Sequence, residues 1–187
     1  RNVNLTGMDL SGADLSDANL TDTNLSGVNL TNSKLSGADL LHTDLSGAKL
    51  IGANLTGANL TGANLMGADV SHTDLTDVNL TDVNLTDVRL SDGNLSGMNL
   101  SGIKMTKANL TNASLTGANL TSVNLTGADL TGANLSEANL SGADLTRANL
   151  LGATLSGTDL RGVNLNGTTL SGADLTRSNL MGTNLTG

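Results

Sequence analysis

Apolar residues recur along the chain at two fixed places in a five-residue repeat. Leu stands at every multiple of five from Leu5 to Leu185, with Val70 and Met105 replacing it among 37 positions. If this position is called i, position i−2 is a small or β-branched residue, most often Ala. Successive side chains of an extended segment point to opposite faces, so i−2 and i share one face while i−1 lies on the other. The pattern predicts a short extended segment with two inward side chains.

The polar positions predict a turn after each segment. Position i−1 is Asn or Asp in 30 of 37 units, i+1 is Ser or Thr in 30 of 37, and i+2 is Gly in 22 of 37. Gly, Asp and Asn at i+2 tolerate an unusual φ or bond to their own backbone, which suits a corner. One unit cannot bury its own Leu, so the units must coil and stack. A period of five fits neither a helix nor the strands of an ordinary sandwich.

Charged residues show a second period, of 20 residues. If four units close one coil, residues 20 apart stack at about 4.8 Å, where like charges are unfavourable. No acid lies 20 residues from another acid, and no base from another base. Acidic residues do meet basic residues or His at that offset: Asp14 with Lys34, Lys49 with Asp69, Asp69 with Arg89, Asp87 with Lys107, Asp22 with His42, and His72 with Asp92. The spacing favours a four-sided coil.

The composition excludes several classes of protein. The 187 residues include no Phe, Trp, Tyr, Pro or Cys, so Leu, Ala and Val must form a narrow core without aromatic residues. The formal net charge of −8 disfavours direct binding to nucleic acid. No apolar run approaches the roughly 20 residues of a membrane span. The chain starts at Arg1, inside the repeat, so we expect a processed or excised product whose compartment is unknown.

The run GADLSDANLTDTNL and the consensus A(D/N)L(S/T)G resemble the pentapeptide-repeat proteins over essentially all 187 residues. The resemblance implies a bacterial source and a single all-β domain, 1–187, folded as a right-handed quadrilateral β-helix with four units per coil. The 37 units would form about nine coils, and no evident cap interrupts the repeat.

The resemblance leaves more than one class of function open. The quinolone-resistance members look like acidic DNA rods and engage DNA gyrase, which implies a DNA-mimicking inhibitor or protector of such an enzyme as the alternative. This chain lacks that group's Phe at i, its interrupting loop and its aromatic C-terminal helix. We therefore expect a non-enzymatic structural or interaction protein that binds a protein partner or itself, with no catalytic, cofactor or metal site.

One candidate surface is acidic. Four acids take position i+2 in successive units and two precede them, which gives an acidic belt of Asp69, Asp74, Asp77, Asp82, Asp87 and Asp92. The belt is either a docking surface or a set of turn residues replacing Gly, and turn chemistry favours the second interpretation. Carboxylates placed around a coil do not converge on a metal ion. His42 and His72 would face opposite directions, so they suggest no active site.

The ends of the repeat are the second candidate. An open coil exposes inward Leu side chains and unpaired strand edges. Either caps lie in neighbouring sequence, or another copy covers the ends through Val3, Leu5, Leu180 and Leu185. Head-to-tail contacts of the second kind form filaments when the operation does not close.

Overall fold

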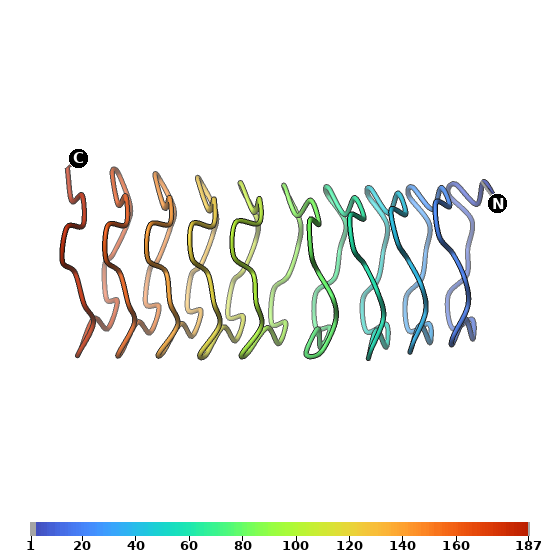
Figure 1. Ribbon diagram of the computed structural model, residues 1–187, viewed down its shortest axis with the longest axis horizontal. Helices are drawn as coiled ribbons and strands as arrows, with labels where there is room; N and C mark the ends of the chain where they lie inside the picture. Colours follow the sequence, from blue (N-terminus) through green and yellow to red (C-terminus); the bar gives the residue numbers. More distant parts are fainter. Residues whose placement is uncertain (1–2, 187) are drawn as a thin grey trace.

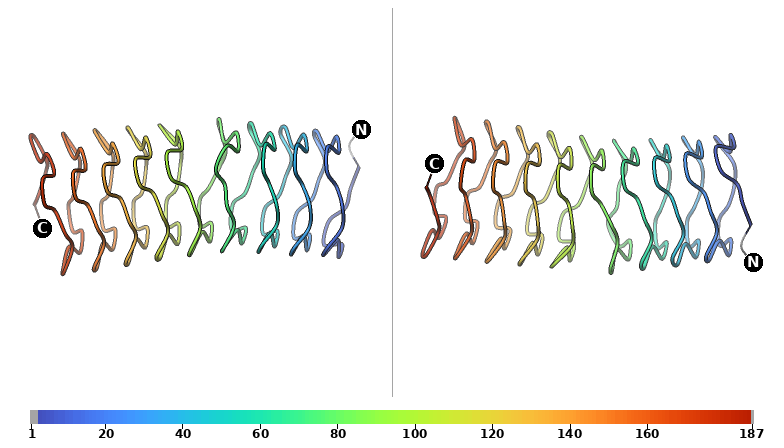
Figure 2. Two further views of the ribbon diagram at one scale, coloured as in Figure 1. Left: turned by 90° about the horizontal axis from the view of Figure 1, so that it is seen from below. Right: turned by 90° about the horizontal axis from the view of Figure 1, so that it is seen from above.

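The computed structural model describes residues 3–186 and shows a coil that repeats every 20 residues (Figures 1 and 2). Parallel bridges one residue long join position i−1 of each unit to the residue 20 further on, from Asn4↔Asn24 to Asn164↔Asn184. Turns at i+1 and i+2 separate the bridges, and the described residues contain no helix and no longer strand. Four units therefore complete one circuit, and the predicted β-solenoid is confirmed. The predictions of a right-handed winding and of about nine coils remain predictions.

The inward rows form one continuous hydrophobic core. Leu side chains at i are buried from Leu25 to Leu165, and the small residues at i−2 are buried beside them. Leu110, for example, is 0% exposed, and Ala108 beside it is also 0% exposed. Because each coil is covered by a coil above and a coil below, Leu is buried without any aromatic residue. Towards the ends of the described chain, inward residues such as Leu10 and Leu175 are only partly buried.

Every corner of the solenoid places its i+2 residue in the left-handed region of backbone space. Among the non-glycine residues there, φ runs from 52° at His42 to 63° at Asp77. Residues with a Cβ enter this region at a cost, which Asn and Asp bear better than most because their short polar side chains bond locally. The corner geometry explains the prevalence of Gly, Asp and Asn at i+2 and confirms the prediction of turns there.

A second bonding pattern explains the polar residues at i−1 and i+1. The side-chain oxygen of Asn54 accepts hydrogen bonds from the Thr56 N–H at 3.0 Å and from the Thr56 hydroxyl at 2.8 Å. Asn134 and Ser136 repeat this arrangement at 3.0 and 2.7 Å. The Asn or Asp therefore holds the start of each corner as an Asx-turn does. The sequence patterns at i−1 and i+1 are thus one feature, which inspection of each position by itself does not reveal.

The bridge ladder is interrupted at two places on successive circuits. Within residues 3–186, no bridge joins Asn54 to Asp74 or Asn79 to Asn99, although bridges flank both gaps. The coils are visibly further apart in the green segment of Figures 1 and 2. The turn at residues 76–77 lies between the two interruptions, so the solenoid is not uniform along its length.

Candidate functional site

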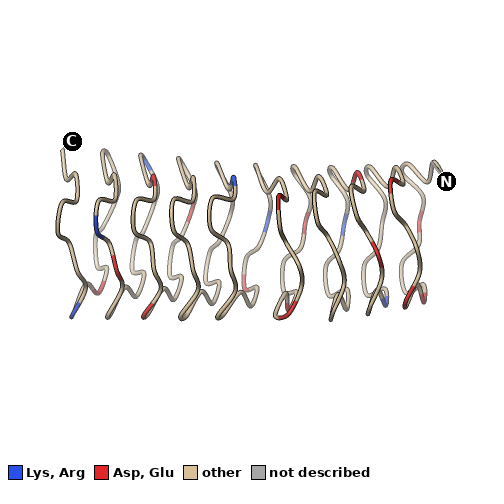
Figure 3. Cartoon of the chain, viewed as in Figure 1, with Lys and Arg blue, Asp and Glu red and all other residues tan. Residues whose placement is uncertain are grey.

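The acidic belt lies where the sequence predicts it, on the corners of one circuit. Asp77, Asp82, Asp87 and Asp92 occupy four successive corners, all exposed and all with positive φ between 55° and 63°. Their φ values give these four residues the role of turn residues that replace Gly. Whether the belt also docks a partner is not determined by this geometry, and that hypothesis stays a prediction. Acidic and basic residues are spread along the whole rod rather than gathered on one side (Figure 3).

The two remaining belt residues lie in the middle of sides, at position i−1. The Asp69 carboxylate is partly buried and pairs with Arg89 at 3.5 Å. The Asp74 carboxylate accepts bonds from the Thr76 hydroxyl and N–H and from the Asn94 amide, and the pKa of Asp74 is lowered chiefly by the Thr76 hydroxyl. Both carboxylates are thus engaged within the rod, unlike those of Asp77, Asp82 and Asp87, which accept no hydrogen bond from residues 3–186.

Four of the six charge pairs predicted at the 20-residue offset form. Their separations are 3.3 Å for Lys34–Asp14, 3.5 Å for Arg89–Asp69, 3.5 Å for His42–Asp22 and 3.7 Å for His72–Asp92. Lys49–Asp69 and Asp87–Lys107 do not approach to 4 Å in the described part of the chain. Asp69 lies between Lys49 and Arg89 in one row, and its carboxylate turns to Arg89. Exposed pairs of this kind stabilise by only about 0–1 kcal/mol each.

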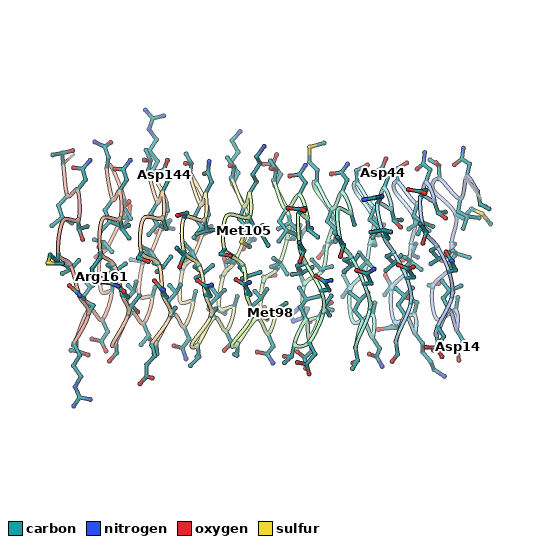
Figure 4. The ribbon with its side chains drawn as sticks, viewed as in Figure 1. Asp14, Asp44, Met98, Met105, Asp144 and Arg161 are labelled. Carbon is teal, nitrogen blue, oxygen red and sulfur yellow. The ribbon has the colours of Figure 1, made fainter. Side chains whose placement is uncertain are left out.

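One ion pair was not foreseen, because it lies within a single unit. The Arg161 guanidinium donates to both carboxylate oxygens of Asp159, at 2.9 and 3.0 Å from Nε and at 2.6 Å from Nη2 (Figure 4). Arg161 occupies position i+1, where Ser or Thr normally donates to the same acceptor. The guanidinium lowers the pKa of Asp159. Arg161 therefore replaces the usual hydroxyl contact with a charged one.

The hollows of the surface lie at one end and between two coils. One hollow of about 530 Å³ at the N-terminal end is lined by Val3, Leu5 and residues 19–23. Two crevices of about 400 and 440 Å³ lie between residues 76–86 and residues 96–104. Asp77 lines the first crevice, and Asp82 and Lys104 line the second. Over residues 3–186, no group of three or more His, Asp or Glu is arranged to hold a metal ion.

The ends of the described solenoid expose the four residues proposed for end stacking, though to different degrees. Val3 is 48% exposed, Leu180 38% and Leu185 61%, whereas Leu5 is only partly exposed. Each of these residues would face inward if a further coil followed. The exposure fits the end-stacking hypothesis without testing it. No helix within residues 3–186 has the length and apolar character to cross a membrane.

Acid should weaken the solenoid through the i−1 carboxylates. The pKa is lowered at Asp9, Asp14, Asp74, Asp144, Asp159 and Asp174, mainly by the hydroxyl, N–H or guanidinium two residues on. A pKa that is lower in the folded state gives stability that is present above the unfolded value and lost as pH falls through the folded one. Replacing Asp74, Asp144 and Asp174 with Asn keeps the acceptor oxygens. We expect this triple variant to match the parent near pH 7 and to lose less stability between about pH 5 and pH 2.

Thermal unfolding followed over this pH range provides the measurement. The control is the corresponding triple change of Asp77, Asp82 and Asp87 to Asn, which removes the same charge from residues without such bonds. This control should leave the acid transition where it is. Equal shifts in both triple variants would attribute acid sensitivity to net charge and not to the bonded carboxylates.

The bridge ladder, the left-handed corners and the two inward rows define a β-solenoid built from five-residue repeats. The family model for pentapeptide repeats matches residues 1–37, 23–62, 43–82, 84–121, 113–150, 124–162 and 148–187. The chain belongs to the pentapeptide repeat family, as the resemblance of its sequence implied.

Solved structures of this family cover most of the chain. HetL, a protein involved in heterocyst differentiation regulation in the cyanobacterium Nostoc sp. strain PCC 7120, is 33% identical over 97% of this chain and 89% of its own, with a TM-score of 0.50. A protein of the Arabidopsis thaliana thylakoid lumen is 26% identical over 68% of each chain, with a TM-score of 0.36. QnrB1, a plasmid-mediated fluoroquinolone resistance protein, is 22% identical over 93% of this chain and 86% of its own, with a TM-score of 0.41. No curated protein sequence matches the chain.

Proposed function

We propose that this chain is a non-enzymatic structural or interaction protein, a right-handed solenoid of about nine coils whose flat sides bind protein partners. The observation that carries the proposal is the equivalence of the outward side chains. Asn59 bonds to Asp39 on the previous coil at 3.1 Å, and Asn119 bonds to Asn99 in the same way at 3.0 Å. Catalysis needs a group whose surroundings differ from those of its copies. A surface of repeated, internally bonded side chains suits binding over an extended area instead.

The rod's charge supports a partner with a basic surface. The net charge is −8, and Asp77, Asp82 and Asp87 are exposed without a bonded neighbour in the described chain. Charge complementarity of this kind raises association rates and selects partners more than it adds affinity. The corner positions make the charge easy to remove without loss of fold, because Asn32 and Asn112 adopt the same backbone geometry.

Cross-linking mass spectrometry with cell extract tests this proposal. The parent chain is compared with a variant in which Asp77, Asp82 and Asp87 become Asn. We expect a protein that cross-links to the parent, with a basic surface at the contact, and whose yield falls at least about tenfold with the variant. An equal yield for both chains would contradict binding through these acids. Protection or inhibition of gyrase in a supercoiling assay at equimolar protein would instead support the DNA-mimicking alternative.

We also propose that the ends stack on those of other copies. A second copy of the same solenoid offers the matching inward rows and a coil edge that continues the parallel ladder. Small-angle scattering at rising concentration measures this association as an increase in rod length. Changing Leu185 to Lys should abolish the increase while leaving the single rod intact. A parent chain of constant length at every concentration would remove the end-stacking proposal and leave side-on binding untouched.

A further inference from the structure

We propose that the solenoid has a built-in opening point between residues 76–86 and 96–104, where bulky inward side chains hold two coils apart and divide the rod into two blocks. The proposal goes beyond partner binding, because it concerns how stability is distributed along the rod. In a repeat protein, stability is approximately a sum of repeat and nearest-neighbour interface terms. One weakened interface therefore sets where the rod opens.

The backbone contacts between these two coils are incomplete. Elsewhere the N–H at i donates to the carbonyl 19 residues on, as Leu120 does to Asn139 at 2.7 Å. Across the opening point, none of the equivalent bonds from Asp77, Leu80 and Asp82 forms within residues 3–186. In the reverse direction, Asn99 does not donate to Val78. Most of one side and both of its flanking corners have lost the ladder.

The turn at residues 76–77 is loosened from both neighbouring coils. In the direction of the N-terminus, the expected bond from the Gly57 N–H to the Thr76 carbonyl does not form in the described chain. Towards the C-terminus, the Asp77 N–H has no bond to the Ser96 carbonyl. Residues 85 and 87 regain contact with the next coil, through Leu85 to Lys104 at 3.0 Å and Asp87 to Thr106 at 2.9 Å. The loss is therefore confined to part of one circuit.

The inward side chains at i−2 explain the separation. Val78 stacks over Met98 on one side of the coil, and Val83 stacks over Ile103 on the next, whereas Ala118 stacks over Ala138 where the ladder is closed. Extra volume in a close-packed core forces backbone shifts. Met98 lies in the middle of the rod (Figure 4), where a narrow core offers no other space.

The same residues are the ones that solvent reaches. Val78 is 6% exposed, Met98 7% and Ile103 6%, whereas Ala118 and Ala138 are 0% and 1% exposed. The crevices of about 400 and 440 Å³ open over them. Their lips carry unpaired N–H and carbonyl groups alike, which water satisfies. A core reached by water at one interface has the low local stability from which sub-global opening starts.

Amide hydrogen exchange, resolved by NMR, tests the proposal on the parent chain. We expect the amides of Leu80, Asp82 and Asn99 to exchange at least about tenfold faster than those of Leu120, Ser122 and Asn139, which hold equivalent positions on the closed coils. Equal protection of the two sets would overturn the proposal. This comparison needs no substitution, so a failure of a variant to fold cannot obscure it.

Two reciprocal variants test the cause. Changing Met98 and Ile103 to Ala should close the coils and slow exchange at Leu80 towards that of Leu120. Changing Ala118 to Val together with Ala138 to Met places the bulky pair on the same side of the solenoid at a closed interface, and exchange at Leu120 should rise. The matched control, Val163 to Ala, removes core volume elsewhere and should leave Leu80 unchanged. If the transplanted pair left Leu120 protected, bulky stacking would not be the cause and the proposal would fail.

Discussion

Changing Leu110 to Ala is expected to lower the free energy of unfolding by about 2–5 kcal/mol. Leu110 is 0% exposed and belongs to the continuous core, where it stacks between the Leu side chains of the coils before and after it. The cost combines the lost transfer of methyl groups from water with the cavity left behind. Because the backbone ladder fixes the spacing of the coils, the cavity cannot collapse fully. Urea denaturation monitored by circular dichroism measures the effect.

Leu185 provides the matched control for this substitution. It takes the same position in its repeat but is 61% exposed. Changing Leu185 to Ala should therefore move the denaturation midpoint far less than changing Leu110. Similar losses at both positions would contradict the assignment of position i to a core that is filled in the middle of the rod and open at its end.

Changing Gly152 to Pro is expected to cost at least about 3 kcal/mol, since Pro fixes φ near −65° and has no N–H. Gly152 has φ of 64° and donates its N–H to the Ser171 carbonyl at 2.9 Å, so both properties conflict with the corner. A Cβ at this position would meet nothing within 4 Å. The effect is therefore one of backbone geometry and hydrogen bonding and not of crowding. The denaturation midpoint reports it directly.

Gly152 to Asn separates these causes. Asn32 and Asn112 adopt φ of 56° at equivalent corners, so Asn fits the backbone and keeps the N–H. We expect a loss of about 1 kcal/mol or less for this variant. A Pro variant as stable as the Asn variant would mean that residue 152 does not have the left-handed geometry, and the corner assignment would be wrong.

The fold could be predicted because the register never breaks. Leu at every fifth position leaves one arrangement in which each Leu is buried, and the alternation of charge at Asp14 and Lys34 shows how many units close the coil. The link between Asn54 and Thr56 escaped prediction, because a frequency at each position does not reveal which side chains bond to each other. Lys49 was paired wrongly with Asp69, since position in a row does not determine which of two neighbours an exposed carboxylate contacts.

The opening point also escaped the sequence analysis, for a different reason. Val78 and Met98 each read as tolerated variants of a small inward residue when they are considered one at a time. Their effect appears only when the 20-residue stacking places one above the other. The candidate site was harder still to predict, because the acids of the belt occupy corner positions that the backbone requires for its own turns.

The stacking of residues 20 apart is the claim on which every other inference depends. The chain contains no Cys, so pairs can be introduced and their oxidation followed without background. Cysteines at Asn119 and Asn139, which form a parallel bridge, should give a disulfide readily under mild oxidant. Cysteines at Asn119 and Asn134, on different sides of the coil, should remain reduced. A disulfide between positions 119 and 134, with none between positions 119 and 139, would contradict the four-sided solenoid.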